Sequence, residues 1–353
     1  MSLSFHSLKV LGVEPVAEQA VQLRLAIPPA LRGEFTFSPG QHVALRAVLE
    51  GREVRRTYSI VNAAPGNEIR LGIRVQRPGG LAHHLATAVR SGDSVEVLNP
   101  TGRFMRSAAS AEARSYLALA AGSGITPVLA IMTAVLEQEP ASTFVLIYGN
   151  RSAARTMYLE EIQALKNRFM SRLAVHFLMS QEAQENELFN GRLNGERVKA
   201  LAGLLFEPAS VDEVFICGPG SMVASTRDAL RELGTTAPMH FERFTTTDDP
   251  AQAAAAPATT DEAAITIIQD GRRRSFKMQP GDASVLDAAA RAGIDLPFAC
   301  RSGVCSTCRA RIVSGAATMA HNVALENWEL EAGYILCCQA RPTGPELELS
   351  YDS

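Results

Sequence analysis

The sequence predicts three folded units in a row: an antiparallel β-barrel, an α/β unit with a parallel sheet, and a small cysteine-bearing unit. Three observations lead to this prediction. Short alternating stretches fill the N-terminal third, continuous apolar runs alternate with helical patterns in the middle, and a low-complexity segment isolates roughly 90 C-terminal residues. A length of 353 residues is enough for two or three domains. With 46% apolar residues and a net charge of −3, the composition argues against nucleic acid or a membrane as the main partner.

The first unit, residues 1–108, is expected to form a small barrel. Its polar and apolar residues alternate as antiparallel strands require. Turn residues such as Pro39-Gly40 and Pro65-Gly66-Asn67 separate the stretches at short intervals, which is typical of a small closed sheet. The expected strands are Leu8–Val13, Val21–Leu25, His42–Ala47, Thr57–Ile60, Ile69–Val75 and Ser94–Val97.

The second unit, residues 109–244, changes to the pattern of a parallel sheet with helical crossovers. Tyr116–Ala121 is a continuous apolar run, which is typical of a strand buried on both faces. A helix is expected from Pro127 to about Gln138, with Thr126 as its N-cap. The other expected elements are the strands Phe144–Tyr148, Leu173–Met179 and Glu213–Cys217 and the helix Leu159–Phe169.

Residues 245–262 are expected to form a flexible linker, which leaves residues 263–353 as the third unit. The segment is small, polar and proline-containing, and it has no large apolar residue with which to anchor itself. No targeting segment is recognisable, and the longest apolar stretch, Tyr116–Val135, is interrupted by a glycine loop. The cytoplasm is therefore the expected location, with no membrane contact.

The cysteine pattern of the third unit is the strongest chemical signal in the chain. Cys300, Cys305 and Cys308 form a C-x4-C-x2-C run, which is the ligand spacing of a plant-type [2Fe–2S] cluster. Gly303 supplies the residue without a Cβ that such a tight loop needs. A structural zinc site would show two close pairs of ligands, and disulfides would need an oxidising compartment. The cluster is therefore the favoured interpretation.

The fourth ligand has two candidates in the sequence, the adjacent Cys337 and Cys338. If Tyr334–Ala340 is a strand, neighbouring side chains point to opposite faces of it. Only one of the two thiols can then face the cluster, and alternation alone does not decide which one.

Two further motifs indicate sites for a flavin and for a dinucleotide. Arg56-Thr57-Tyr58-Ser59 lies on an expected barrel strand, between Phe37-Ser-Pro-Gly-Gln41 and Ile73-Arg74-Val75. Gly122-Ser-Gly-Ile-Thr-Pro127 lies between the first buried strand and its helix. Glycines let the backbone approach a pyrophosphate, and the helix N-terminus attracts its charge. A glycine loop alone is only moderately specific, but its position after a buried strand strengthens the prediction.

These motifs together resemble the ferredoxin–NADP reductase superfamily, extended by a plant-type ferredoxin domain of the α+β, β-grasp class. The resemblance implies that Arg56 holds a flavin phosphate, Tyr58 packs on the isoalloxazine ring and Ser59 hydrogen-bonds near its reactive edge. The flavin is expected to be FAD, with FMN as the alternative. The resemblance adds, for the phosphate end of the flavin, Ile73, Arg74, Val75, Gly80, Leu81 and Ala82.

The same resemblance implies a nicotinamide site. It places Cys217 beside the nicotinamide ring, and Glu242 and Phe244 close over the flavin. The nucleotide-binding residues it implies are Gly122, Ser123, Gly124, Thr126, Arg151, Cys217, Gly218 and Pro219. Ser180-Gln181 stands where NADPH-specific relatives often have Ser-Arg, although Arg151, Arg155 and Arg192 are cations that could contact a 2′-phosphate. NADPH is expected, with NADH as the alternative.

The resemblance also implies the fourth cluster ligand. Plant-type ferredoxin domains read Cys-Gln-Ala at this point, which selects Cys338 and leaves Cys337 as a small buried apolar side chain. The metal ligands expected from the sequence are Cys300, Cys305, Cys308 and Cys338.

Together the expected cofactors make an electron-transfer reductase. Paired electrons would enter from the nicotinamide cofactor and leave one at a time through the cluster, so the cofactors supply the reactive chemistry and no catalytic side chain is expected. The domain order resembles that of oxygenase reductases, among them the reductase subunits of di-iron oxygenases that epoxidise the ring of phenylacetyl-CoA. A reductase of a Rieske or ketosteroid hydroxylase, or a redox sensor that binds flavin without turnover, is the alternative.

Overall fold

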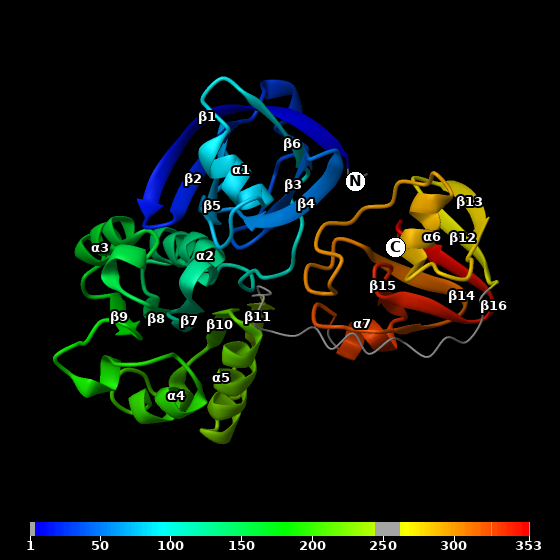
Figure 1. Cartoon of the computed structure of the whole chain (residues 1–353). Helices are drawn as coiled ribbons and strands as arrows, with labels where there is room; N and C mark the ends of the chain where they lie inside the picture. Colours follow the sequence, from blue (N-terminus) through cyan, green and yellow to red (C-terminus); the bar gives the residue numbers. More distant parts are fainter. Residues whose placement is uncertain (1–3, 244–261, 326, 353) are drawn as a thin grey trace. The chain divides into compact units, whose positions relative to one another are not determined.

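The computed structural model describes residues 4–243, 262–325 and 327–352 (Figure 1). These residues belong to two compact units, one formed by residues 4–243 and the other by residues 262–352. The expected linker, apart from residue 262, and Phe244 lie outside the described residues. Among the helices of the described chain, none is long and apolar enough to cross a membrane.

The larger unit begins with a six-stranded antiparallel sheet in the order β4-β3-β6-β1-β2-β5. A bridge between Ile60 and Leu71 brings the two edge strands together, so the sheet closes as the predicted barrel. Its strands are β1 (Phe5–Ala17), β2 (Ala20–Ala26), β3 (His42–Leu49), β4 (Arg52–Ser59), β5 (Glu68–Arg74) and β6 (Ser94–Leu98). Helix α1 (Leu81–Thr87), which the sequence did not predict, adds Leu81 and Leu85 to the barrel core.

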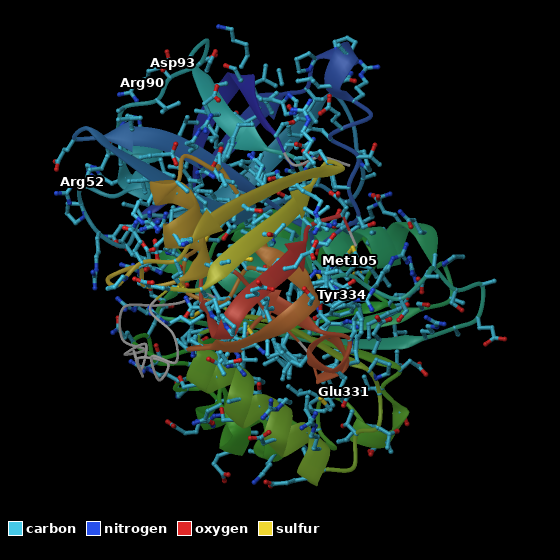
Figure 2. All side chains as sticks on the ribbon, turned by 90° about the vertical axis from the view of Figure 1, so that its right-hand side faces the viewer. Arg52, Arg90, Asp93, Met105, Glu331 and Tyr334 are labelled. Carbon is cyan, nitrogen blue, oxygen red and sulfur yellow. The ribbon has the colours of Figure 1, made fainter. Side chains whose placement is uncertain are left out.

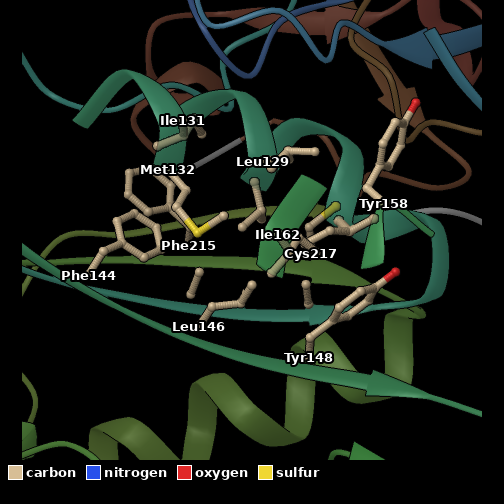
Figure 3. Packing of buried hydrophobic residues seen from close by; sticks show 14 of the residues in the cluster. Leu129, Ile131, Met132, Phe144, Leu146, Tyr148, Tyr158, Ile162, Phe215 and Cys217 are labelled. Carbon is tan, nitrogen blue, oxygen red and sulfur yellow. The ribbon is translucent and has the colours of Figure 1, made fainter. Parts of the chain in front are cut away.

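The second part of this unit is a five-stranded parallel sheet in the order β11-β10-β7-β8-β9, which confirms the predicted α/β class. Its strands are β7 (Ser115–Ala121), β8 (Thr143–Asn150), β9 (Leu173–Met179), β10 (Glu213–Gly218) and β11 (Met239–Arg243). Its helices are α2 (Ile125–Gln138), α3 (Leu159–Arg168), α4 (Gly195–Leu201) and α5 (Gly220–Glu232). Helices α2 and α3 cover one face of the sheet, where Leu129 and Met132 pack near Phe144 and Phe215 (Figure 3), and α4 and α5 cover the other.

Helix α2 starts two residues before the predicted position. A short 3-10 turn over Gly122–Gly124 leads directly into Ile125, and Gly124 occupies the N-cap. The prediction of Thr126 as N-cap was therefore wrong. The Thr126 hydroxyl instead donates a hydrogen bond to the Ser123 carbonyl at 2.9 Å within the first turn. Pro127 is tolerated there because the first N–H groups of a helix have no partner inside it.

The smaller unit is a five-stranded mixed sheet in the order β13-β12-β16-β14-β15. Its strands are β12 (Ala264–Gln269), β13 (Arg272–Lys277), β14 (Arg309–Met319), β15 (Tyr334–Leu336) and β16 (Ala340–Ser350). Helix α6 (Val285–Arg291) packs on β16 and buries Val285 and Leu286 in the core. The short helix α7 (Asn327–Glu331) precedes β15, and Figure 2 labels Glu331 and Tyr334 at this connection.

The expected strand Tyr334–Ala340 is divided in the structure. Strand β15 ends at Leu336, a turn occupies residues 337–339, and β16 begins at Ala340. The turn is closed by a hydrogen bond from the Gln339 amide to the Leu336 carbonyl at 2.8 Å. Both adjacent cysteines therefore lie in a turn, so the alternation of side chains along a strand does not apply to them.

A buried carboxylate, Glu213, ties the connection after the barrel to the base of the parallel sheet. Its Oε1 accepts a hydrogen bond from the Ser107 amide at 2.7 Å and lies 2.7 Å from Nε2 of His240. The His240 ring also stacks on Phe215, with 5.2 Å between centroids. Burial alone would raise the pKa of the Glu213 carboxyl, but the His240 and Ser107 hydrogen bonds outweigh burial and lower that pKa below its ordinary value.

The Glu213→Gln substitution should lower the free energy of unfolding by about 1–3 kcal/mol at pH 7, because a charged acceptor of buried hydrogen bonds is lost. The folded-state pKa of Glu213 lies below that of an unfolded glutamate, so its stabilisation is present above about pH 4.3 and is lost as the pH falls through the folded-state pKa. Denaturant unfolding of both proteins from pH 7 to pH 3 should show the deficit shrinking at acid pH. Glu207→Gln, at an exposed carboxylate of the same unit, is the matched control. A deficit that does not vary with pH would contradict this account.

Candidate functional site

The end of β4 presents the side chains predicted to hold the flavin. Arg56 is exposed, and its guanidinium donates a hydrogen bond to the neighbouring Arg55 carbonyl at 2.7 Å. Burial raises the pKa of the Tyr58 phenol, which stays protonated. The Ser59 hydroxyl oxygen is buried and has no hydrogen-bond partner among the described residues. A buried hydroxyl without a partner is costly unless a ligand satisfies it, so this strand fits a bound flavin.

The residues predicted for the phosphate end of the flavin lie on β5 and at the start of α1. Arg74 is held inside the protein, because its guanidinium donates to the carbonyls of Glu18 at 3.2 Å and Arg155 at 2.6 Å. Burial lowers the Arg74 pKa from its ordinary value, and the charges of Arg155 and Arg151 lower it further. Gly80 is the N-cap of α1 and has open space beside it, as a backbone that lines a ligand requires. Around them lie the buried Ile73 and Leu81, the half-buried Ala82, and Val75, whose amide donates to Gln19.

In the glycine loop at the carboxyl end of β7, the position of Gly124 leaves no room for a side chain. A Cβ on Gly124 would lie 2.1 Å from the Cys217 carbonyl oxygen, so only glycine fits between β7 and β10. Gly122 has a φ of +54°, and its carbonyl accepts a hydrogen bond from the Tyr148 hydroxyl at 2.8 Å. These contacts leave the loop, with Ser123 at its centre, at the edge where a parallel sheet binds ligands.

Cys217 and Glu242 meet at the same edge of the sheet. They are opposite each other in the pairing of β10 with β11. Cys217 is fully buried, and burial, followed by the Glu242 charge, raises the pKa of its thiol well above the ordinary value. It is therefore a neutral thiol here. Gly218 ends β10, and Pro219 is the N-cap of α5.

His42 belongs to this site although sequence reasoning treated it as an ordinary barrel residue. Its Nδ1 lies 3.4 Å from Oε1 of Glu242, and both side chains are largely buried. The pairing of β3 with β4 places His42 opposite Ser59. No local sequence pattern could have predicted this contact, because it joins the first residue of a barrel strand to β11 of the parallel sheet, which is far away in the sequence.

The arginines expected near a 2′-phosphate differ in their surroundings. Arg151 is exposed, and its carbonyl accepts a hydrogen bond from the Gln181 amide at 2.8 Å, so it lies beside the segment that follows β9. Arg192 is also exposed, next to Gly191, whose amide donates to the last residue of β9. Arg155 instead faces Glu18 at 3.9 Å.

The four predicted ligand thiols come together in the smaller unit. Cys300 lies beside Cys305 and Cys338, and the interaction with their thiols lowers its pKa, while Cys338 also lies beside Cys308. Backbone amides approach two of the sulfurs: the Cys338 amide, from the turn after β15, lies 3.5 Å from the Cys308 sulfur, and the Ser302 amide, from the loop, lies 3.4 Å from the Cys300 sulfur. Four converging, mostly buried thiols with amide donors fit an iron–sulfur cluster, because amides stabilise the charge on thiolate ligands.

Two details of the loop support this geometry. Gly303 has a φ of +76°, and a Cβ there would lie 2.8 Å from the His321 carbonyl, so the predicted need for glycine is confirmed. Cys337 is fully buried in the core of the unit and lies beside the Tyr351 phenol. The turn at residues 337–339 thus gives the two adjacent cysteines different surroundings.

The arginines around the cysteine loop are engaged within the unit. Arg301 bonds to Asp287 at 2.6 Å and lies over the Phe298 ring. Arg309 bonds to the buried carboxylate of Glu329 at 2.8 Å and lies over a tyrosine ring. These contacts brace the loop from both sides and give the arginines a structural role.

Three family models match the chain. The model of the 2Fe-2S iron-sulfur cluster binding domain matches residues 267–343, that of the oxidoreductase NAD-binding domain matches residues 118–228, and that of the oxidoreductase FAD-binding domain matches residues 7–105.

Two curated relatives cover almost the whole chain. A subunit of the 1,2-phenylacetyl-CoA epoxidase of Escherichia coli (strain K12) is 38% identical over 351 residues, which are 99% of this chain and 98% of the relative. The 3-ketosteroid-9-alpha-monooxygenase, ferredoxin reductase component, of Rhodococcus rhodochrous is 30% identical over 356 residues, which cover 97% and 96% of the two chains.

Solved structures share the fold. Phthalate dioxygenase reductase, described as a modular structure for electron transfer from pyridine nucleotides to [2Fe-2S], matches with a TM-score of 0.58 and 22% identity over 98% of each chain. An intact type IV self-sufficient cytochrome P450 monooxygenase matches with a TM-score of 0.70 and 20% identity over 98% of this chain and 41% of that one. These likenesses establish the three-part architecture.

Replacing the two adjacent cysteines one at a time should separate their roles. Cys338→Ala should remove the fourth thiolate, so the purified protein should lose most of its iron and acid-labile sulfide and its visible cluster absorption. Cys337→Ala should keep the cluster and lose about 1–2 kcal/mol of stability, because it only empties a small part of the core. Equal iron content in the two variants would contradict the assignment of Cys338.

Proposed function

Because the chain belongs to the family of FAD-, NAD- and [2Fe–2S]-binding reductase components of oxygenases, we propose that it carries electrons from NADPH to a di-iron oxygenase that epoxidises the ring of phenylacetyl-CoA. The observation that carries the proposal is the 38% identity with the epoxidase subunit over nearly the full length of both chains. The general activity, that of an NAD(P)H-dependent flavin and iron–sulfur oxidoreductase, follows from the three domains together. We further propose that the protein acts in the cytoplasm.

Different residues would bind each of the three cofactors. When bound, the flavin accepts a hydride and the cluster passes single electrons, which is the chemistry that the cofactors bring. Arg56 would bind a flavin phosphate, Tyr58 would cover the ring, and Ser59 would donate or accept a hydrogen bond at its edge. The loop from Gly122 to Thr126 would receive the pyrophosphate of the nicotinamide cofactor. Cys300, Cys305, Cys308 and Cys338 would hold the two irons.

The preference for NADPH rests on the exposed cations at the carboxyl edge of the sheet. Arg151 stands next to Gln181, where a relative that selects NADPH often has its own arginine, and Arg192 flanks the end of β9. Both guanidinium groups are exposed, so a 2′-phosphate would gain their charge at little cost in desolvation. Arg155 is less suited, because it faces Glu18.

A second candidate function is supported by the 30% identity with the ketosteroid monooxygenase reductase. Under that alternative the chain would serve an oxygenase of the Rieske or ketosteroid hydroxylase type. Single-turnover reduction of purified candidate oxygenases separates the two: reduction of a Rieske component but of no di-iron component would overturn the proposal. The absence of flavin reduction by either nicotinamide would favour a redox sensor without turnover.

Cys305→Ser should separate the two halves of the electron path. Reduction of ferricyanide by NADPH should persist near the wild-type rate, because the barrel and the parallel sheet are intact. Reduction of cytochrome c and of the di-iron oxygenase should fall to background, because a serine at this ligand position disrupts the cluster. Cys337→Ala is the matched control and should keep all three activities. Loss of ferricyanide reduction in a folded, flavin-loaded Cys305→Ser protein would contradict the proposed order of transfer.

Arg151→Ala should weaken NADPH selectively. Loss of one charge-assisted contact to a phosphate should raise KM for NADPH about tenfold, with KM for NADH changed less than about twofold. Steady-state ferricyanide reduction with each cofactor measures both constants. Arg52→Ala, at an exposed arginine of the barrel (Figure 2), is the control and should change neither. An equal rise for both cofactors would show that Arg151 does not read the 2′-phosphate.

A further inference from the structure

His42 and Glu242 form a buried pair between the two parts of the larger unit. His42 is the first residue of β3 in the barrel, and Glu242 lies in β11, the last strand of the parallel sheet. Nδ1 of the histidine is 3.4 Å from Oε1 of the glutamate, and the two side chains are 4% and 13% exposed. Burying a charged or polar pair costs desolvation free energy, so a pair that is buried this well is expected to have a functional or structural role.

Each partner of the pair stands opposite a residue of the cofactor site. His42 is paired with Ser59 across β3 and β4, and Glu242 is paired with Cys217 across β10 and β11. The Ser59 hydroxyl, Nδ1 of His42 and the second carboxylate oxygen of Glu242, Oε2, are all buried without a hydrogen-bond partner among the described residues. Three unsatisfied polar atoms, two from the barrel and one from the parallel sheet, therefore gather at this point, as a site for a polar ring edge requires.

The imidazole of His42 has a fixed orientation. Its Nε2 lies 3.4 Å from the Thr101 hydroxyl, and the backbones of His42 and Thr101 exchange two hydrogen bonds of 2.8 Å. Gly102, with a φ of +114°, passes so close that a Cβ there would lie 2.8 Å from Nδ1. Nδ1 also lies 3.4 Å from Oε1 of Glu242, which is an ion-pair contact and not a hydrogen bond.

We propose that His42 is a positioning residue for hydride transfer. The contact of its Nδ1 with Oε1 of Glu242 limits the rotation of that carboxylate, so that Oε2 stays directed to the subsite formed with Ser59 and Cys217, where the nicotinamide and flavin rings would meet. The glutamate side chain is flexible, and without a second contact its carboxylate would occupy several rotamers. A neighbouring residue that fixes one rotamer keeps the carboxylate in the position that the reaction needs. The inference rests on the flavin and nicotinamide sites proposed above.

Amide substitutions distinguish the two nitrogens of His42. Asparagine places its amide nitrogen near the position of Nδ1, whereas glutamine places it near that of Nε2. His42→Ala should slow bleaching of the flavin by NADPH about tenfold in stopped flow, because misplaced groups near reacting atoms cost rate. The Kd for NADP⁺, from the perturbed flavin spectrum, should change less than about twofold, since the phosphates are held elsewhere. His42→Asn should restore the rate to within about threefold of wild type, and His42→Gln should not.

A double-mutant cycle tests the dependence on Glu242. In a Glu242→Gln background, His42→Ala should slow bleaching by less than about twofold more, because the partner it positions is already altered. The amplitude of the spectral change on adding NADP⁺ should shift in the same way in His42→Ala and Glu242→Gln. If the rate losses of His42→Ala and Glu242→Gln multiply in the double variant, or if His42→Asn and His42→Gln restore the rate equally, the proposal is overturned. His42 would then contribute only packing.

The controls separate this inference from the proposed function. His6→Ala removes another histidine–glutamate contact of the barrel, 3.0 Å to Glu34, and should leave every readout unchanged. Flavin content and melting temperature of each variant show whether folding is affected; a rate loss in His42→Ala that follows flavin loss alone would contradict a positioning role. If the wild-type protein binds no flavin, the proposed function fails. If it is bleached normally and His42→Ala is too, this inference alone fails.

Discussion

Close packing at one backbone turn organises the larger unit. The turn from Gly122 to Thr126 touches the Cys217 carbonyl on one side, where Gly124 leaves room for no side chain. On the other side it reaches β5 of the barrel, where a Cβ on Gly72 would lie 2.4 Å from the Thr126 methyl group. Glycines at both contacts let the two sheets approach, and this approach brings the ends of β4, β10 and β11 into one site.

Much of the architecture could be predicted because its signals are local. Continuous apolar runs identified the parallel strands, turn residues identified the barrel, and the spacing of Cys300, Cys305 and Cys308 identified the cluster loop. The start of α2 was misplaced because a 3-10 turn precedes it, so the helical backbone begins before the proline that marked it. The helices α4 and α5 were missed, although α5 follows directly on a predicted motif.

The contacts that sequence reasoning could not reach are non-local. His42 meets Glu242, and Arg74 donates to the Arg155 carbonyl, only because the barrel docks on the parallel sheet. The separation of Cys337 from Cys338 depends on a turn where a strand was expected. In each case the residue type indicated a possible role. The contacts of the residue, however, depend on segments that are far away in the chain and are set by how two surfaces pack together.

Strand β16 is the last strand along the described chain, yet it lies in the middle of its sheet, between β12 and β14. Strands β12 and β13 pair with each other, as do β14 and β15, but only β16 joins these two pairs into one sheet, and such long-range pairing is slow to form. The contact of Cys308 with the turn that carries Cys338 belongs to the pair of β14 and β15, so β16 serves to attach this pair to the rest of the sheet.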